Sequence, residues 1–262
     1  MHKQYIYEPR FLPYGGQVVP LAAIMAVLGN DWDRQSAREK LERWFWCGVF
    51  GELYGGTTET RFSRDLPETV AWIDEGRDEP RTVAEAAFSP ARLLTLRTRI
   101  SAAYKGIYAL LLKEGARDWR TGTEATVQNY FDDAVDIHHI FPKAWCEQQE
   151  IEAKKYDSIV NKTALSARTN RSIGGRAPSE YMQRVASGAG ISAHALDANV
   201  SSHFIEPQLL RNDNFSVFLD LRSQALLGRI ENAMGKPATL TGPTAPEEDE
   251  VVTYDLLDQQ SV

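Results

Sequence analysis

The sequence predicts a mainly α-helical protein with a small β-containing segment just past its middle, which is an α+β fold. Two observations carry this prediction. Apolar residues recur at helical spacing through the first half, in stretches bounded by Gly or Pro. Two short runs of bulky, β-prone residues then interrupt the pattern between positions 134 and 166. The 262 residues suffice for one large domain or two modest ones with a real core.

Four helices are predicted in the first half. Residues 18–29 are apolar but too short to cross a bilayer, so they are interpreted as a buried helix. Residues 34–56 form a long amphipathic helix, and residues 65–76 form a shorter one with Pro67 in its first turn. The stretch 89–116 is predicted to be one continuous helix that Gly115 ends.

The second half changes character at the two β-prone runs. Residues 134–142 and 158–166 are predicted to be strands, and a polar excursion separates them. A glycine pair then breaks the chain, and Pro178 begins the next helix. A long helix is predicted over 214–235.

The chain is expected to divide into three parts. Residues 1–130 form a helical scaffold, and residues 131–236 form a core with the two strands and the C-terminal helices. Residues 237–262 form an acidic tail that is predicted to be disordered, because it has six acidic residues and no Lys or Arg.

The charge distribution matters more than the net charge of −7. Residues 151–190 hold seven basic and three acidic residues, a local excess of +4 just after the histidine pair. Such a patch is compatible with phosphate contact, although these basic residues are also what an ordinary protein surface carries. No signal peptide or membrane span is evident, so a cytoplasmic protein is predicted. Cys47 and Cys146 are predicted to be free, reduced thiols.

The stretch "DIHHIFPKAW", 136–145, places two of the five histidines side by side on the first predicted strand. Phosphodiester hydrolysis near neutral pH needs a base with a pKa near 7 and a stabiliser of developing negative charge. Because adjacent strand residues point to opposite sides, one of His138 and His139 could bind a metal while the other faces the attacking water. Asn161 could orient the base, and Asn170 could return to the metal through its side-chain oxygen. Such a ligand set suits Mg²⁺ or Mn²⁺ better than a closed zinc site.

Ordinary structural roles remain open for each of these residues. The two histidines could be a partly buried pair on a strand. Asn161 could be a turn residue, and Asn170 could simply cap a helix. Histidines 2, 194 and 203 have no matching neighbours and are predicted to be structural or exposed.

Taken together, the spaced residues resemble the HNH, or ββα-metal, endonucleases. The resemblance is to the C-terminal nuclease domains of GmrSD-type, modification-dependent restriction and phage-defence proteins, and it covers roughly residues 136–185. The residues that carry it are His138, His139, Ile140, Phe141, Pro142, Asn161, Asn170, Ile173, Gly174, Pro178 and Tyr181. A ββα-metal core within the α+β fold is therefore expected.

The resemblance implies a role for each residue of the site. His138 would be a metal ligand, and His139 would be the general base. Asn161 would orient the base and brace the loop. Asn170 stands where many of these enzymes have a last histidine, so it would be the second protein ligand to Mg²⁺ or Mn²⁺. Two further residues would assist: Asp136 as a ligand or an acceptor behind one, and Arg176 as a phosphate clamp.

The same resemblance implies double-stranded DNA, from phage or modified, as the substrate. Such proteins usually begin with a ParB/Srx-like nucleotide-hydrolysing domain that carries an Asp-Gly-Gln-Gln-Arg motif, which this sequence lacks. The chain is therefore expected to be the C-terminal part of a larger protein or a separate subunit. The alternative function is a binding module for modified DNA or a partner protein that does not cut. A nuclease toxin held by an immunity protein is a third, minor possibility.

Overall fold

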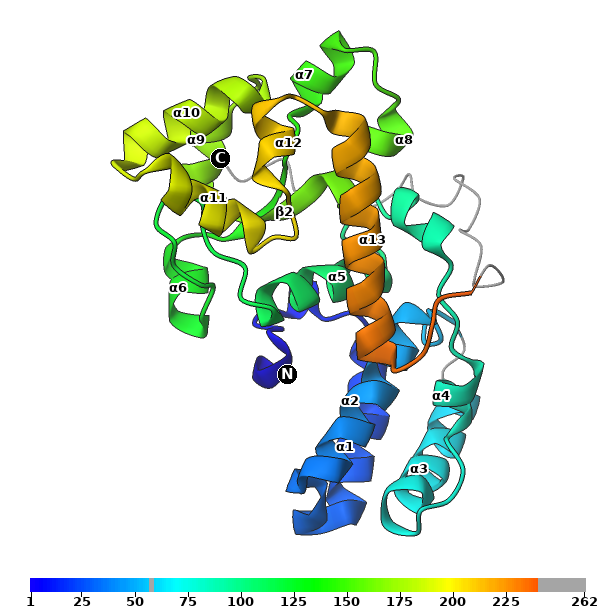
Figure 1. The fold of residues 1–262 in the computed structure, drawn as a ribbon. Coiled ribbons are helices and arrows are strands. Elements are labelled where there is room, and N and C mark those ends of the chain that lie inside the picture. The colour runs from blue at the N-terminus through cyan, green and yellow to red at the C-terminus, as the bar shows by residue number, and fades with distance from the viewer. Residues whose placement is uncertain (57–58, 240–262) are drawn as a thin grey trace, which may run out of the picture.

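Helices dominate the structure, a computed structural model that describes residues 1–56 and 59–239. Within these residues the strands form one two-stranded antiparallel sheet, which lies near the centre of the molecule (Figure 1). The prediction of a mainly helical α+β fold is confirmed at this level.

The N-terminal helices form one end of the molecule (Figure 1). They are α1 (Gly15–Leu28), α2 (Gln35–Phe50), α3 (Glu59–Asp74) and α4 (Arg81–Glu85). Three short 3-10 helices accompany them: His2–Gln4, Pro9–Phe11 and Gly29–Asp33. Relative to the predictions, α2 ends six residues early and α3 begins six residues early.

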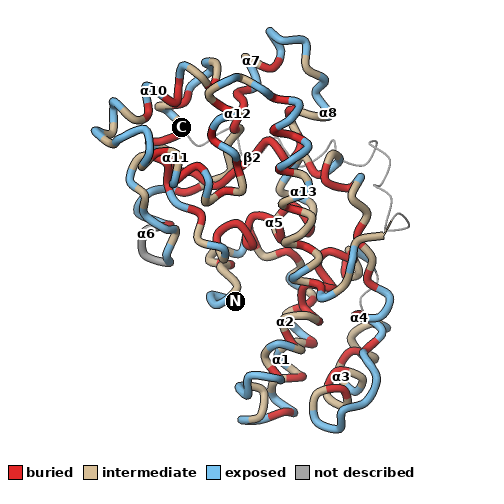
Figure 2. Tube along the Cα trace, viewed as in Figure 1, coloured by how far each residue is buried: buried red, intermediate tan, exposed pale blue. Residues whose placement is uncertain are grey.

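The predicted buried helix at 18–29 is present as α1, but only one of its faces is buried. Gln17, Ile24 and Leu28 point inward at helical spacing, whereas Val19 and Val27 are 60% and 62% exposed. Figure 2 shows the same alternation along the helix. Apolar composition alone therefore overstated the burial of this helix, because only one of its faces packs against the other N-terminal helices.

The single long helix predicted at 89–116 is wrong. A short 3-10 helix, Pro90–Leu94, comes first, and α5 (Ala102–Lys113) begins only after a non-helical stretch. Ser101 caps α5 by accepting a hydrogen bond from the Tyr104 backbone N–H. The α5 helix is buried along nearly its whole length (Figure 2). The break at 95–101 brings two arginines up to the sheet, as described below.

The two strands are shorter than predicted. Strand β1 (Asp136–His139) pairs with β2 (Lys162–Leu165), with His138 opposite Thr163 and His139 opposite Lys162. The sequence predicted that Asn161 would lie within the second strand, but the structure places it just before β2. It ends a 3-10 helix, Ile159–Asn161, that leads directly into β2.

The remaining helices surround the sheet and close the core. They are α6 (Val127–Asp132), α7 (Lys143–Gln148), α8 (Ala153–Tyr156), α9 (Ala167–Ile173), α10 (Pro178–Ala189), α11 (Ala193–Ser201), α12 (Pro207–Arg211) and α13 (Phe215–Met234). The long α13 contacts α2, α5 and the 159–161 turn (Figure 1). One hydrophobic cluster consequently contains residues from both predicted domains, so the two parts share a core.

The acidic tail predicted for 237–262 is described only at its start. Thr239 donates its backbone N–H to Phe88 O at 2.9 Å, and the Ala238 N–H bonds Glu231 Oε1 at 2.9 Å. Residues 237–239 are thus held against the helical part, while residues 240–262 lie outside the described residues.

Candidate active site

An open pocket of about 250 Å³ lies where β1 ends. Its walls include His138 and His139 from β1 and Asn170 from α9, together with Lys143 from the start of α7. Three of the six predicted site residues therefore meet around one cavity, although Asn170 is more than thirty residues from the histidines in sequence.

The residues that follow the histidines anchor the strand end in the core. Ile140 and Phe141 are both fully buried. The Phe141 ring packs against the rings of Phe215 and Phe218 on α13, with centroid separations of 5.2 and 4.8 Å. Because these two apolar residues point inward, the chain turns at Pro142 and the histidines stay at the surface edge of the core.

Two polar side chains hold this turn in place. Asn161 Oδ1 accepts the Phe141 N–H at 2.8 Å, and Asn161 Nδ2 donates to Phe141 O and Tyr156 O, each at 2.8 Å. From α10, the Tyr181 hydroxyl donates to Ile140 O at 2.8 Å. Asn161 thus braces the loop. Its side-chain hydrogen bonds go to the backbone groups of Phe141 and Tyr156, and a different residue bonds the His139 ring.

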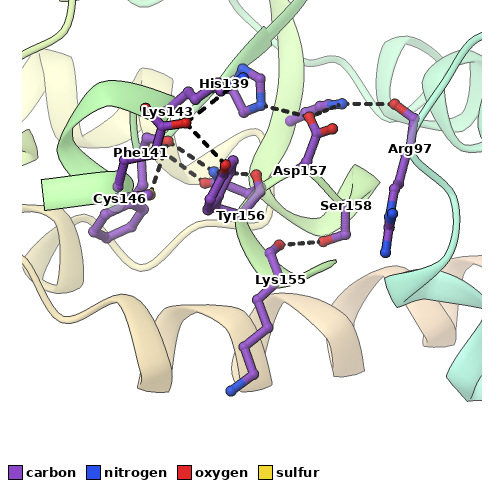
Figure 3. Close-up of polar contacts among 12 residues, drawn as sticks. Arg97, His139, Phe141, Lys143, Cys146, Lys155, Tyr156, Asp157 and Ser158 are labelled. Carbon is purple, nitrogen blue, oxygen red and sulfur yellow. Dashed lines mark hydrogen bonds and ion pairs between the residues drawn. The ribbon is translucent and has the colours of Figure 1, made fainter. Parts of the chain in front are cut away.

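That residue is Asp157. His139 Nε2 lies 3.1 Å from Asp157 Oδ1, and the same carboxylate oxygen lies 2.8 Å from Lys162 Nζ (Figure 3). Partial burial opposes ionisation of Asp157, but hydrogen bonds from His139 and Lys162 outweigh it and lower its pKa to about 2. Lys162 Nζ also donates to Arg97 O at 2.7 Å, which ties the 95–101 stretch to the site.

His138 points to the other face of β1 and has properties that suit a metal ligand. Burial lowers its pKa, an effect that the nearby Asp136 carboxylate opposes, so the neutral imidazole is favoured near pH 7. Within the described residues, its Nε2 atom is buried and lacks a hydrogen-bond partner. A neutral imidazole nitrogen without a partner, on a residue that lines the same pocket as Asn170, fits a divalent cation completed by water or phosphate oxygens.

The helix that carries Asn170 is fixed at both ends. At its start, Asp118 accepts hydrogen bonds from the Ser166 N–H at 3.0 Å and the Thr169 hydroxyl at 2.8 Å. Burial opposes ionisation of Asp118, yet these hydrogen bonds lower its pKa. At its end, Gly174 has φ +60°, a conformation that favours glycine. The predicted break at the glycine pair is thus the stop of α9, and it lines the pocket.

The other two predicted site residues lie elsewhere. Asp136 does not line the pocket and is engaged by arginines, with Arg99 Nη1 3.2 Å from its Oδ2. Arg176 is exposed and lies 3.7 Å from Glu180, one turn further along the chain. Asp136 is close enough to act on the charge of His138 but lies outside the pocket, and Arg176 does not line the pocket either.

Sequence reasoning missed Asp157, Lys143 and Arg99. Asp157 sits at the end of a polar stretch with no periodic signal, and its distance from His139 depends on how the two strands pair.

Of the basic residues counted in 151–190, Lys154 and Lys155 pair with Glu152, whereas Arg168 and Arg171 are exposed on α9. Cys47 and Cys146 are buried free thiols, as predicted.

Comparisons with known proteins yield one relative and no assignment. The chain is 27% identical over 217 residues to the uncharacterized protein MJ0686 of Methanocaldococcus jannaschii. The match covers 73% of this chain and 37% of that protein's length. No family model and no solved structure matches the chain. Among the described helices, none combines the length and apolar character that crossing a bilayer requires.

Proposed function

We propose that this protein is a metal-dependent DNA endonuclease with an HNH-type centre that cuts one strand at a time. The observation that carries the proposal is the pocket itself. It joins a histidine bonded to a carboxylate, a second histidine with an unpartnered nitrogen, and an asparagine amide. The two short strands followed by α9 are the elements that a ββα-metal core requires.

His139 is the general base. If its Nε2–H donates to the ionised Asp157, the lone pair of Nδ1 is left to accept a proton from water. Asp157 keeps the ring in that tautomer and stabilises the imidazolium as it forms. Lys162, bonded to the same carboxylate oxygen, keeps Asp157 ionised. The activated water then attacks the phosphorus.

His138 and Asn170 would hold the metal, with Mg²⁺ and Mn²⁺ the expected ions. Such an ion would stabilise the charge that develops on the phosphate and the departing oxygen. Lys143, exposed at the rim of the pocket, adds a positive charge for the phosphate.

The biological setting follows from the resemblance to GmrSD-type proteins. We infer restriction or anti-phage defence in the cytoplasm, with a ParB/Srx-like nucleotide-hydrolysing domain or subunit as the partner. The chain spans 37% of the length of its relative, so the activity of any longer protein is part of this proposal.

A plasmid-nicking assay with Mg²⁺ or Mn²⁺ tests the function. The native chain should convert supercoiled to open-circular plasmid, and His139→Ala should lower the rate by about 10²-fold or more. Asp157→Asn should lower it less, because the base remains. The matched control is His194→Ala on α11, whose side chain is exposed.

Equal nicking by His139→Ala and the native chain would refute this mechanism. Titration with Mn²⁺ separates the non-cutting alternative. A nuclease should bind the ion through a site that His138→Ala removes, whereas a DNA-binding module should show no such site.

A further inference from the structure

The first residue of β1 lies in a cluster of charges drawn from three distant segments. Asp136 Oδ2 is 3.2 Å from Arg99 Nη1 and 3.9 Å from Arg10 Nη1. Arg99 comes from the break before α5, and Arg10 comes from the 3-10 helix Pro9–Phe11. Arg10 also pairs with Glu8 at 2.7 Å. Among the described ion pairs, Arg99 contacts the Asp136 carboxylate, and Arg10 contacts the same carboxylate.

The Phe11 ring packs against both guanidinium groups. Arg10 Cζ and Arg99 Cζ lie 5.1 and 6.0 Å from the centroid of the Phe11 ring. That ring is buried, and its centroid lies 4.3 Å from the centroid of the stacked Tyr108 ring, so core packing holds it in place. The Arg99 side chain is still 41% exposed. A planar, half-exposed guanidinium on a rigid support is well suited to bind a phosphate through paired hydrogen bonds.

The cluster lies beside the proposed active site and is tied to it. Asp136 and His138 are two residues apart on one strand, so their side chains share a face about 6.6 Å apart. The stretch that carries Arg99 is also held by the bond from Lys162 to Arg97 O, and Lys162 contacts the Asp157 that bonds His139 (Figure 3). A phosphate at Arg99 would therefore be positioned relative to the base.

We propose that Arg99, supported by Arg10, binds a DNA backbone phosphate next to the phosphate at which the strand is cleaved. In the free protein, Asp136 holds the two arginines. This gives Asp136 a different role from metal ligation and gives the phosphate clamp to Arg99 instead of Arg176. The proposal rests on the proposed function only in taking DNA as the partner.

Binding of a labelled duplex oligonucleotide, followed by fluorescence anisotropy between 50 and 200 mM salt, tests it. EDTA is present throughout, so neither metal nor cleavage contributes. Arg99→Ala should weaken binding by about tenfold and reduce the slope of log K against log salt by about 1. Arg77→Ala, an exposed arginine just after α3, is the charge-matched control and should leave both unchanged.

Asp136→Asn tests the same proposal through a change that should strengthen DNA binding. Removing the competing carboxylate should tighten DNA binding several-fold in EDTA, which the loss of a metal ligand would not do. Arg99→Gln removes the charge but keeps the start of the side chain and a neutral hydrogen-bond donor. It replaces Arg99→Ala in the assay if circular dichroism shows that Arg99→Ala is unfolded.

The proposal is overturned if a folded Arg99 variant binds DNA like the native chain, if Asp136→Asn leaves affinity unchanged or weaker, or if the native chain does not bind DNA. Failure of the nuclease proposal looks different. A native chain that binds DNA through Arg99 but never nicks with metal would retain this site and lose the chemistry.

Discussion

The N-terminal helices and the segment around the sheet are stabilised in different ways. Helices α1 to α3 span 14 to 16 residues and pack largely through apolar side chains at helical spacing, although Gln17 and Asp65 are buried and hydrogen-bonded among them. The strands are four residues long, and α7, α8 and α9 span four to seven. Elements this short are unstable alone, so their geometry depends on their surroundings.

Single polar side chains from distant elements provide that geometry. Arg222 on α13 is fully buried and donates to backbone carbonyls of Val160, Lys162 and His203. Around the pocket, Tyr181 donates to a backbone carbonyl, Asp118 accepts from a backbone N–H, and Asn161 does both. The difference teaches that the helical end should tolerate conservative change, whereas the site segment should depend on a few specific hydrogen bonds.

The largest effect is expected at Asn161. Asn161→Ala leaves the buried N–H and C=O of Phe141 and the Tyr156 carbonyl without this partner, which should cost about 3–5 kcal/mol in urea unfolding. Asn161→Asp is the sharper variant, because it keeps the acceptor for the Phe141 N–H but turns a carboxylate oxygen toward two carbonyls. If either variant lost less than about 1 kcal/mol of unfolding free energy, the site segment would not depend on these hydrogen bonds, and the contrast with the helical end would be wrong.

His203 should make the sheet segment sensitive to acid. It is fully buried, between Thr163 Oγ1 at 2.6 Å and Arg117 O at 2.7 Å, and burial lowers its pKa from 6.5 to about 4. Between those two pH values the unfolded chain binds a proton that the folded chain does not, so stability falls as pH drops from 6.5 to 4. The total loss should be on the order of 3 kcal/mol.

The measurement compares the native chain with His203→Gln in urea at pH 7 and pH 4. The native advantage should shrink on acidification, while exposed His194→Gln should follow the native chain at both pH values. An advantage that stays constant from pH 7 to pH 4 would show that His203 is not buried in its neutral form.

The smallest effect is expected on the outer face of α1. Val27 is 62% exposed, so Val27→Ala should change stability by less than about 0.5 kcal/mol. Ile24, fully buried one turn earlier, should lose about 1 kcal/mol as Ile24→Val. Equal losses at the two positions, measured by thermal unfolding, would mean that the outer face of α1 is covered in solution.

Part of the fold and site was predictable because it depends on neighbours in sequence. Helical periodicity located α2 and α13, an apolar run located α1, and Pro178 after the glycine pair marked the start of α10. The β-prone runs located both strands. The opposite orientation of His138 and His139 follows from the period of two in a strand. The buried state of Ile140 and Phe141 follows from their apolar character.

Other features could not be read locally. The stretch 95–101 continues an apolar pattern typical of a helix, yet it is non-helical and is bonded by Lys162 through the Arg97 carbonyl and by Asp136 through the Arg99 side chain. The partnership of Asp157 with His139 requires the register of β1 on β2, which no local pattern encodes. The exposed face of α1 depends on which helices pack beside it.

Sequence alone determined the helical class of the protein, the place of its two strands and the identity of the histidine pair, because these follow from spacing along the chain. Tertiary structure decided which residues join that pair. Asn170 entered the pocket, Asp157 bonded His139, and Asp136 turned to Arg99 and Arg10. The physical reason is that hydrogen bonds and ion pairs act over a few ångströms, and only folding brings groups tens of residues apart within that range.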